Sequence, residues 1–248
     1  AYITASTYAF NNVITRNNRV QNNTDYGIQI SVQGNIDMTN NGISDNTGYG
    51  AYVYTGNGNA DIINNEICNN AGYGAYISAS NGNVGINGTV LSYNGARGIL
   101  IDGAKNIEIV NAEISENVGY GVYISGVSNG NIISIRNTQS SGNHDYGIQI
   151  SGGKNVEMIN NQVYGNLGYG VAILGTYMNS NIDASKIFSN NGFGVSISGT
   201  GSVSSVNLNR IYNNNGNGII FNGKQVIIDG NYIYSNNATG NEGGGINI

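Results

Sequence analysis

The chain has 248 residues, with 39 glycines, 18 tyrosines, no proline and only 9% charged residues. Its net charge of −5 with nine lysines and arginines leaves no basic stripe to replace phosphate counterions, which argues against nucleic-acid binding. No apolar run reaches the roughly 18 residues that a membrane span needs, and evenly spread β-branched and aromatic residues argue against disorder.

A Tyr-Gly pair recurs along the whole chain, and the residue before its glycine serves as the reference position of a repeat. The reference position falls at Tyr26, Tyr49, Tyr73, Arg97, Tyr120, Tyr146, Tyr169, Phe193, Asn217 and Gly244. Three residues earlier an asparagine stands each time, at Asn23, Asn46, Asn70, Asn94, Asn117, Asn143, Asn166, Asn190, Asn214 and Asn241. Ten occurrences at spacings of 23–27 residues predict about ten coils of a repeat protein.

Each coil carries three short apolar segments in chain order. The first coil shows alternating apolar residues at 28–30, again at 36–38, and a single apolar point at Ile43. This period of two is typical of strands, and no segment has the pattern of an amphipathic helix. Three short strands per coil cannot bury their apolar side chains alone, so the coils are expected to stack as an all-β parallel solenoid. Ten coils spaced by one strand separation would give a rod roughly 50 Å long.

The invariant glycines and asparagines fit such a solenoid. Glycine supplies a positive φ or lets another backbone pass closely, and asparagine tolerates tight turns. Repeated in register, the asparagine amides are expected to bond from coil to coil as an internal ladder. Proline is absent because nearly every amide is needed for pairing between coils.

The heptapeptide DYGIQIS occurs at 25–31 and again at 145–151. Reference positions also repeat at an offset of 120 residues, as at Tyr49 and Tyr169. We therefore expect a single domain over 1–248 that arose by duplication of five coils, about 1–124 and 125–248. The alternative is a reused site, since Asp25 and Asp145 are the only acidic residues directly before the reference position.

The repeat resembles that of the parallel β-helix proteins of the pectate-lyase-like superfamily. The resemblance covers essentially the whole chain and is carried by runs such as NVGYGVYI at 117–124 and NLGYGVAI at 166–173. It implies a right-handed parallel β-helix. The superfamily includes polysaccharide lyases, hydrolases and C-5 epimerases, phage tailspikes, periplasmic NosD-like proteins and surface-layer or adhesin repeats, so the fold alone decides no function. The Tyr-Gly-Phe-Asp-Pro-His run of mannuronan epimerases is absent, because the chain has no proline.

Catalytic residues are hard to find in this sequence. The single histidine, His144, lies beside Asp145, with Glu116 and Arg136 within about one coil of it, and a His-Asp pair could act as acid and base. The alternative is a polar turn without catalytic role. No metal site or cofactor is predicted, because the single Cys68 lacks a partner, and Asp25 with Asp45 offers only a sparse calcium cage.

Tyr52, Tyr76 and Tyr123 share the second position after the repeat glycine, which is predicted to point outward. Stacked on one strand they would form an aromatic stripe suited to sugar stacking or subunit contact. The alternative is ordinary stacking between coils that stabilises the sheet. Asn22, Asn87 and Asn237 each begin an N-x-T sequon and are candidate glycosylation sites.

The leading functional hypothesis is a non-catalytic extracellular or cell-surface structural protein. No capping helix is predicted at either end, so the chain is expected either to be cut from a longer protein or to stack end to end on other copies of itself into a filament or surface layer. The alternatives are a carbohydrate-binding or adhesive module, and a polysaccharide lyase, epimerase or hydrolase acting on an acidic glycan.

Overall fold

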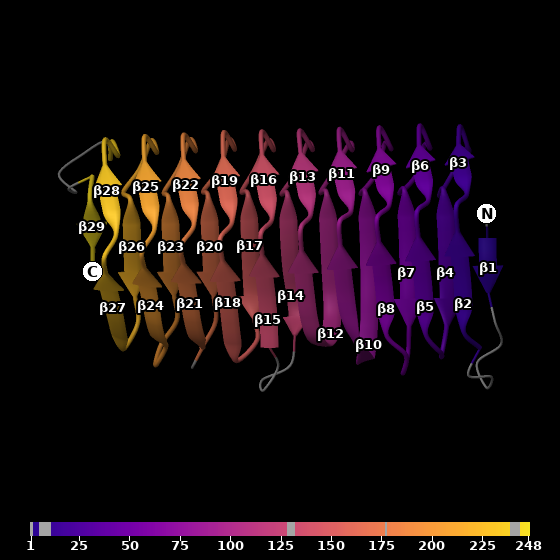
Figure 1. Cartoon of the computed structure of the whole chain (residues 1–248), viewed down its shortest axis with the longest axis horizontal. Helices are drawn as coiled ribbons and strands as arrows, with labels where there is room; N and C mark the ends of the chain where they lie inside the picture. Colours follow the sequence, from indigo (N-terminus) through magenta and orange to yellow (C-terminus); the bar gives the residue numbers. More distant parts are fainter. Residues whose placement is uncertain (1, 5–10, 128–131, 177, 239–243) are drawn as a thin grey trace.

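The computed structural model describes residues 2–4, 11–127, 132–176, 178–238 and 244–248. Within these ranges it contains 29 strands and no helix. The chain winds into an elongated rod with its two termini at opposite ends (Figure 1). All strand pairs are parallel, and each strand pairs with the equivalent strand of the next coil, as Ile28 does with Ala51. The predicted parallel β-solenoid is therefore confirmed.

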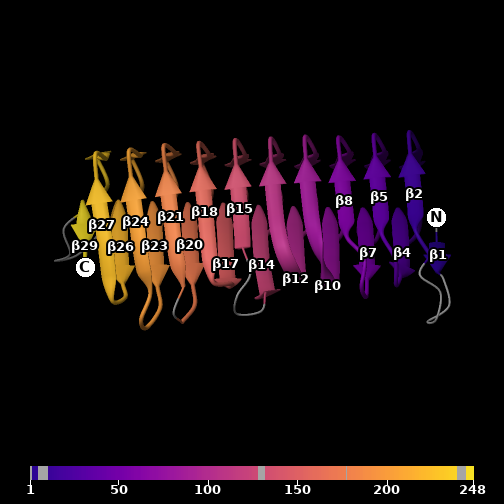
Figure 2. The same cartoon turned by 60° about the horizontal axis from the view of Figure 1, so that its bottom comes forward.

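The strands form three faces that run along the rod, and Figure 2 shows two of them side by side. Face 1 contains β1 (Tyr2–Thr4), β4 (Ile28–Val32), β7 (Ala51–Thr55), the first parts of β10 (Ala75–Asn87) and β12 (Ile99–Val110), β14 (Val122–Val127), β17 (Ile148–Gly152), β20 (Val171–Leu174), β23 (Val195–Ser198), β26 (Ile219–Asn222) and β29 (Ile246–Asn247).

Faces 2 and 3 follow face 1 in every coil. Face 2 contains β2 (Val13–Arg16), β5 (Ile36–Thr39), β8 (Ala60–Ile63), the second parts of β10 and β12, β15 (Ile132–Arg136), β18 (Asn155–Ile159), β21 (Asn179–Asp183), β24 (Val203–Asn207) and β27 (Gln225–Asp229). Face 3 contains β3 (Arg19–Gln21), β6 (Gly42–Ser44), β9 (Glu66–Cys68), β11 (Val90–Ser92), β13 (Glu113–Ser115), β16 (Gln139–Ser141), β19 (Gln162–Tyr164), β22 (Lys186–Phe188), β25 (Arg210–Tyr212) and β28 (Tyr232–Tyr234).

Two coils differ from the expected three short strands. In β10 and β12 the backbone stays extended from face 1 into face 2, so each of these strands has 12 or 13 residues. The core is a stack of aliphatic side chains in columns. Ile30, Val53 and Ile77 are each 0% exposed and follow one another in register on face 1. Burial of such side chains is the dominant stabilising contribution, about 1.5–3 kcal/mol for each.

Most coils turn at two corners where the backbone is left-handed. The corner between faces 2 and 3 has a positive φ at Asn17, Asn40 and their equivalents, and the corner after face 3 at Asn22, Asn69 and theirs. Asparagine is favoured there because it tolerates this conformation. The glycine after the reference position has a different role. A Cβ on Gly50 would lie 2.4 Å from a buried isoleucine methyl and 2.7 Å from the next backbone carbonyl, so close approach and not a positive φ requires glycine there.

Candidate functional site

The invariant asparagines lie inside the rod immediately after the second corner. Their side chains form a continuous ladder from Asn23 to Asn214, in which each Nδ2 donates to the Oδ1 of the next asparagine at 2.8–3.0 Å. The predicted ladder is thereby confirmed at nine positions. The ninth step runs from Asn214 to Asn236 at 2.9 Å, whereas the predicted Asn241 lies outside the described residues.

A second polar ladder, which sequence reasoning missed, runs five residues upstream of the first. It begins with Asn18, Asn41 and Asn65, joined at 2.9 and 3.0 Å, and reaches Thr89. Ala112 interrupts it, and threonine, serine and asparagine side chains resume it from Thr138 to Asn231. An N-x-x-x-x-N spacing was the available signal. Asn, Thr and Ser alternate at this position of the repeat, because all three side chains can accept a hydrogen bond from the same backbone N–H. This variation concealed the spacing.

The reference positions form a column of rings along the corner between faces 3 and 1. Successive ring centroids are 4.5–5.3 Å apart, from Tyr26 to Tyr73 and from Tyr120 to Phe193. Arg97 fills the gap between the two groups, with its guanidinium carbon 5.6 Å from the Tyr73 ring and 5.0 Å from the Tyr120 ring. Two cation–π contacts thus keep the column continuous where an aromatic residue is missing.

The outward tyrosines of face 1 divide into two groups. Tyr52 and Tyr76 stack with centroids 5.1 Å apart and planes inclined by 4°. Leu100 occupies the next coil, so Tyr123 is separated from this pair and instead packs 4.4 Å from the Arg97 guanidinium. Because stacked rings cover each other's faces, this arrangement favours mutual stabilisation over sugar stacking, which needs an open ring face. The sugar-binding role of the three tyrosines stays a prediction.

The histidine lies on an exposed turn after face 3. The Asp145 carboxylate accepts a hydrogen bond from the backbone N–H of Tyr146 at 3.0 Å, which is a local turn contact. Arg136 belongs to face 2, where it pairs with Glu157. The structure therefore does not bring His144 and Arg136 together, and the catalytic role of His144 and Asp145 stays a prediction.

The remaining predicted residues are dispersed. Asp45 lies at a left-handed corner, whereas Asp25 lies further along its coil beside Gly48, so the two carboxylates do not stand opposite each other. No group of three or more acidic, histidine or cysteine side chains converges among the described residues. The sequon asparagines Asn22, Asn87 and Asn237 are exposed, and their glycosylation stays a prediction.

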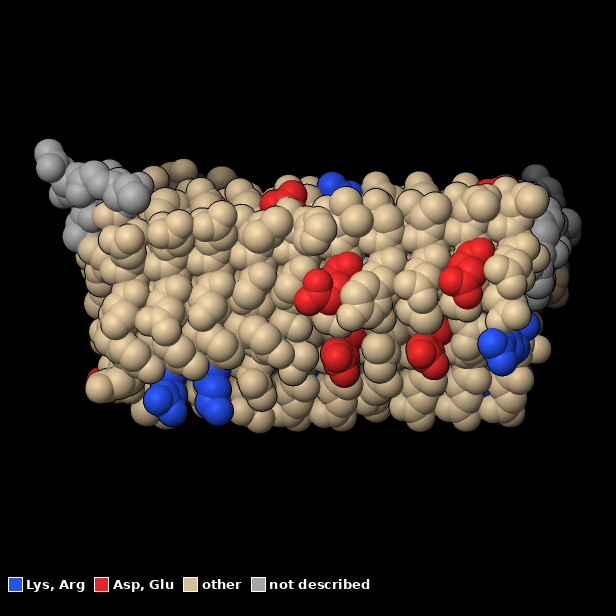
Figure 3. Space-filling model, turned by 90° about the horizontal axis from the view of Figure 1, so that it is seen from above, with Lys and Arg blue, Asp and Glu red and all other residues tan. Residues whose placement is uncertain are grey.

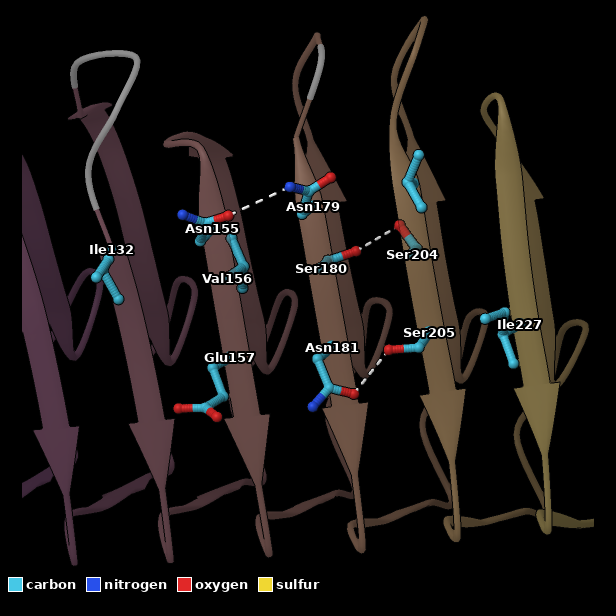
Figure 4. Close-up of a pocket in the computed structure, with 11 residues that line it drawn as sticks. Ile132, Asn155, Val156, Glu157, Asn179, Ser180, Asn181, Ser204, Ser205 and Ile227 are labelled. Atoms are coloured by element: carbon cyan, nitrogen blue, oxygen red, sulfur yellow. Dashed lines mark hydrogen bonds between the residues drawn. The ribbon is translucent and has the colours of Figure 1, made fainter.

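Face 2 carries two hollows of the surface. A shallow groove of about 640 Å³ crosses β15, β18, β21, β24 and β27 (Figure 4). Most of its exposed lining is apolar, but polar side chains lie within it, with Asn181 Oδ1 accepting from the Ser205 hydroxyl at 2.9 Å. Ile132 and Ile227, which are 50% and 53% exposed, stand at its two ends. The groove thus offers amides and hydroxyls along the rod axis between two apolar side chains.

A second hollow of about 460 Å³ lies over β8, β10, β12 and β15 on the same face. Asp61 and Glu108 flank Gly85 in register, and Asp61 Oδ1 leans to 2.8 Å from the place that a Cβ of Gly85 would occupy. Burial, and then the negative charge of Asp37, raise the pKa of Asp61. Hydrogen bonds from Thr39 and Arg16 lower the pKa of Asp37. Sequence reasoning missed the proximity of Asp37 and Asp61, because only the strand register places these two residues side by side.

Charged side chains are sparse elsewhere. Figure 3 shows isolated acidic and basic residues on one face of the rod, without a single large patch. On face 3 the charged column contains Arg19, Glu66, Glu113, Lys186 and Arg210. No helix capable of crossing a membrane occurs among the described residues.

Comparison with protein families gives two matches that together cover nearly the whole chain. Residues 97–248 match the right-handed β-helix region, which confirms the handedness expected from the repeat. Residues 2–138 match NosD, a family described as periplasmic copper-binding protein. A comparison with curated proteins gives no match.

Two solved structures with a similar fold are the A-modules of mannuronan C-5 epimerases AlgE6 and AlgE4 of Azotobacter vinelandii. Both are 17% identical to this chain, with TM-scores of 0.42 and 0.47. The alignments cover 90% and 88% of this chain but only 65% and 63% of those modules. At these TM-scores the likeness carries no conclusion about this chain.

Proposed function

This chain belongs to the right-handed β-helix family and to the NosD family, and on that premise we propose that it acts outside the cytoplasm as a non-catalytic structural protein whose rods assemble end to end. The periplasmic description of the NosD family supports the location. The uniform ladders support the structural role, because the same stabilising contacts recur from coil to coil along the rod, as in an extended structural repeat protein.

The observation that carries the proposal is the state of the terminal coils. The strands β2 and β3 at one end, and β27 and β28 at the other, each pair on one side only with a described strand. Their inward aliphatic side chains, Val13 and Val20 at one end and Val226, Ile228 and Ile233 at the other, are only partly buried although they pack on the core. Open strand edges above a partly exposed core are templates for pairing with another chain.

Electron microscopy and sedimentation velocity of residues 1–248 at rising concentration test this proposal. Fibres one rod wide, or a series of species that are multiples of the monomer, are the expected result. Head-to-tail contacts that do not close into a ring give such open fibres. A monomer of constant sedimentation coefficient at all concentrations would refute end-to-end assembly by this chain.

Copper binding, which the NosD description names, does not fit the donors of this chain. Copper favours cysteine, methionine and histidine ligands. Met38, Met158 and Met178 are at most 2% exposed within the core, Cys68 lies on face 3, and His144 lies on an exposed turn after that face. Because these side chains do not converge, we assign no copper-dependent step to the protein.

A second candidate function is polysaccharide binding in the groove of face 2, and the combination of amides and hydroxyls with exposed apolar side chains supports it. Sugar hydroxyls would exchange hydrogen bonds with Asn181 and Ser205, while Ile132 and Ile227 would pack on ring C–H groups. The Asn181→Arg substitution should block the groove. The polysaccharide in an affinity electrophoresis gel should then no longer retard the variant. Asn81→Arg, at an exposed position of β10 outside the groove, is the matched control. Equal retardation of both variants and the wild type would exclude this groove.

A further inference from the structure

The three faces of the rod hold unequal numbers of strands. Among the described residues, faces 2 and 3 each contain ten strands, whereas face 1 contains eleven, because both β1 and β29 lie on it. If β27 and β28 of one copy paired directly with β2 and β3 of the next, then β29 of the first copy and β1 of the second would need the same place. An in-register junction is possible only when either β1 or β29 gives up its place on face 1.

On face 2 the terminal strands are complementary in the register of the existing pairs. Extending the columns of the sheet by one coil places Val226 opposite Val13, Ile227 opposite Ile14, and Asp229 opposite Arg16. The first pair would complete the partly buried core. The second would cover two isoleucines that are 53% and 62% exposed. The third would place opposite charges on neighbouring strands, which favours pairing.

Face 3 matches in the same register. Ile233 falls opposite Val20, and Tyr232, which is 62% exposed, falls opposite Arg19. An arginine beside an exposed tyrosine ring repeats the contact that Arg97 makes inside the rod. A shift of the junction by one residue would turn every inward aliphatic side chain outward, so only this register satisfies both faces.

The two amide ladders would continue through the same junction. At one end, the Oδ1 atoms of Asn18 and Asn23 accept no hydrogen bond from a described residue. At the other, the only described partner of Asn236 Nδ2 is the Ile211 carbonyl, and the only described partners of Asn231 Nδ2 are backbone carbonyls. The register above brings Asn231 to Asn18 and Asn236 to Asn23. Each ladder would thus gain the amide–amide contact that it makes between coils within the rod.

We infer that assembly is a strand exchange in which β29 of one copy replaces β1 of the next on face 1. This inference rests on the end-to-end assembly proposed above and specifies its register and partner, a second copy of the chain. Both strands are short, and among the described residues each has one partner, β4 for β1 and β26 for β29. Departure of β1 leaves its own copy continuous from β2 onward and lets β29 stay paired with β26. The pairing of β4 with β1 is then exchanged for pairing with β29.

Charge reversal tests the register. Arg16→Asp and Asp229→Arg should each lower the association constant at least about tenfold, because like charges would face each other at the junction. Combining the two reversals in one chain should restore association. Asp37→Asn, which removes the carboxylate that Arg16 contacts within its own chain, is the matched control and should assemble normally.

The outcomes separate the two proposals. Assembly of the wild type together with undiminished assembly of both single reversals would refute this register and leave end-to-end assembly intact. A wild type that never assembles would refute both proposals.

A reversible tether tests the exchange itself. Ile3 and Ile30 are backbone partners in the β1–β4 pair, and neighbouring strands are close enough for a disulfide. In a Cys68→Ser background, Ile3→Cys with Ile30→Cys should remain monomeric when oxidised and assemble after reduction. Cys68→Ser alone should assemble in both states.

Deletion of residues 1–10 should strengthen association, because the competing strand is gone, and far-UV circular dichroism would verify that this variant folds. Full assembly of the oxidised, tethered chain would refute the exchange. A folded deletion variant that no longer assembles would refute it as well.

Discussion

Replacing Asn117 by alanine removes one step from the middle of the buried amide ladder. The side chain is 0% exposed. Its Oδ1 accepts from both the backbone N–H and Nδ2 of Asn94 at 3.0 Å. Its Nδ2 donates to Asn143 Oδ1 at 3.0 Å and to the Leu91 carbonyl at 3.1 Å. The substitution therefore removes four hydrogen bonds at once.

The cost follows from the groups left behind. Two donors of Asn94 lose their acceptor inside the rod, and an unsatisfied buried group costs about 1–3 kcal/mol. The two acceptors, Asn143 Oδ1 and the Leu91 carbonyl, contribute less to this cost, because each also accepts another hydrogen bond. Asn143 Oδ1, for example, still accepts from the backbone N–H at position 117. We expect Asn117→Ala to lower the free energy of unfolding by about 2–6 kcal/mol.

Urea denaturation followed by far-UV circular dichroism measures this loss. Asn81→Ala is the control, because Asn81 Nδ2 also donates to an asparagine of the neighbouring coil at 2.9 Å but is exposed to solvent. Its loss should stay within about 1 kcal/mol, since water replaces the partner. If both variants unfold at the same urea concentration, burial of the ladder does not matter and the reasoning is wrong.

Three further predictions use the same unfolding assay. Gly98→Ala should lower the free energy of unfolding by about 1–3 kcal/mol, because the new Cβ would lie 2.5 Å from a buried isoleucine methyl. Gly42 has open space around it, so Gly42→Ala should leave the stability nearly unchanged. Equal losses in the two variants would contradict this reasoning. Arg97→Ala should cost about 0.5–2 kcal/mol through its cation–π contacts, whereas Arg97→Tyr should keep the column and the stability. Asp61→Asn should raise the melting temperature at pH 7, because burial raises the pKa of Asp61 and its ionisation opposes folding as pH rises. The gain should vanish below about pH 4, where the carboxyl is protonated in both states; Asp37→Asn should instead destabilise at pH 7, because the pKa of Asp37 is lowered.

The sequence predicted the solenoid because stacking imposes the same requirement on every coil. Gly50 and its equivalents must lack a Cβ where the backbone passes the ladder, and Asn46 and its equivalents must both donate and accept. Such positions tolerate a single residue type, so their spacing is visible in one sequence. Positions that tolerate several types, such as Thr89 and Ser185 in the second ladder, leave no comparable signal.

The surface could not be predicted from the same pattern. Asp37 and Asp61 are 24 residues apart, and they become neighbours only because the coil length at that point places them in register. His144 and Arg136 are only eight residues apart, yet Arg136 lies on face 2 and His144 follows face 3. Proximity in sequence therefore indicates little about proximity on a solenoid surface, where each corner turns the next residues to another face.

The parallel winding also determines how the rod would respond to tension on its two termini. The terminal coils bear the load first, and each is held only by the neighbouring coil. A pull along the axis should therefore peel coils away one after another instead of rupturing the rod at once. Each coil released would lengthen the chain by about 80 Å, at roughly 3.3–3.6 Å per residue. A filament of such rods would act as an extensible tether with a regular force pattern.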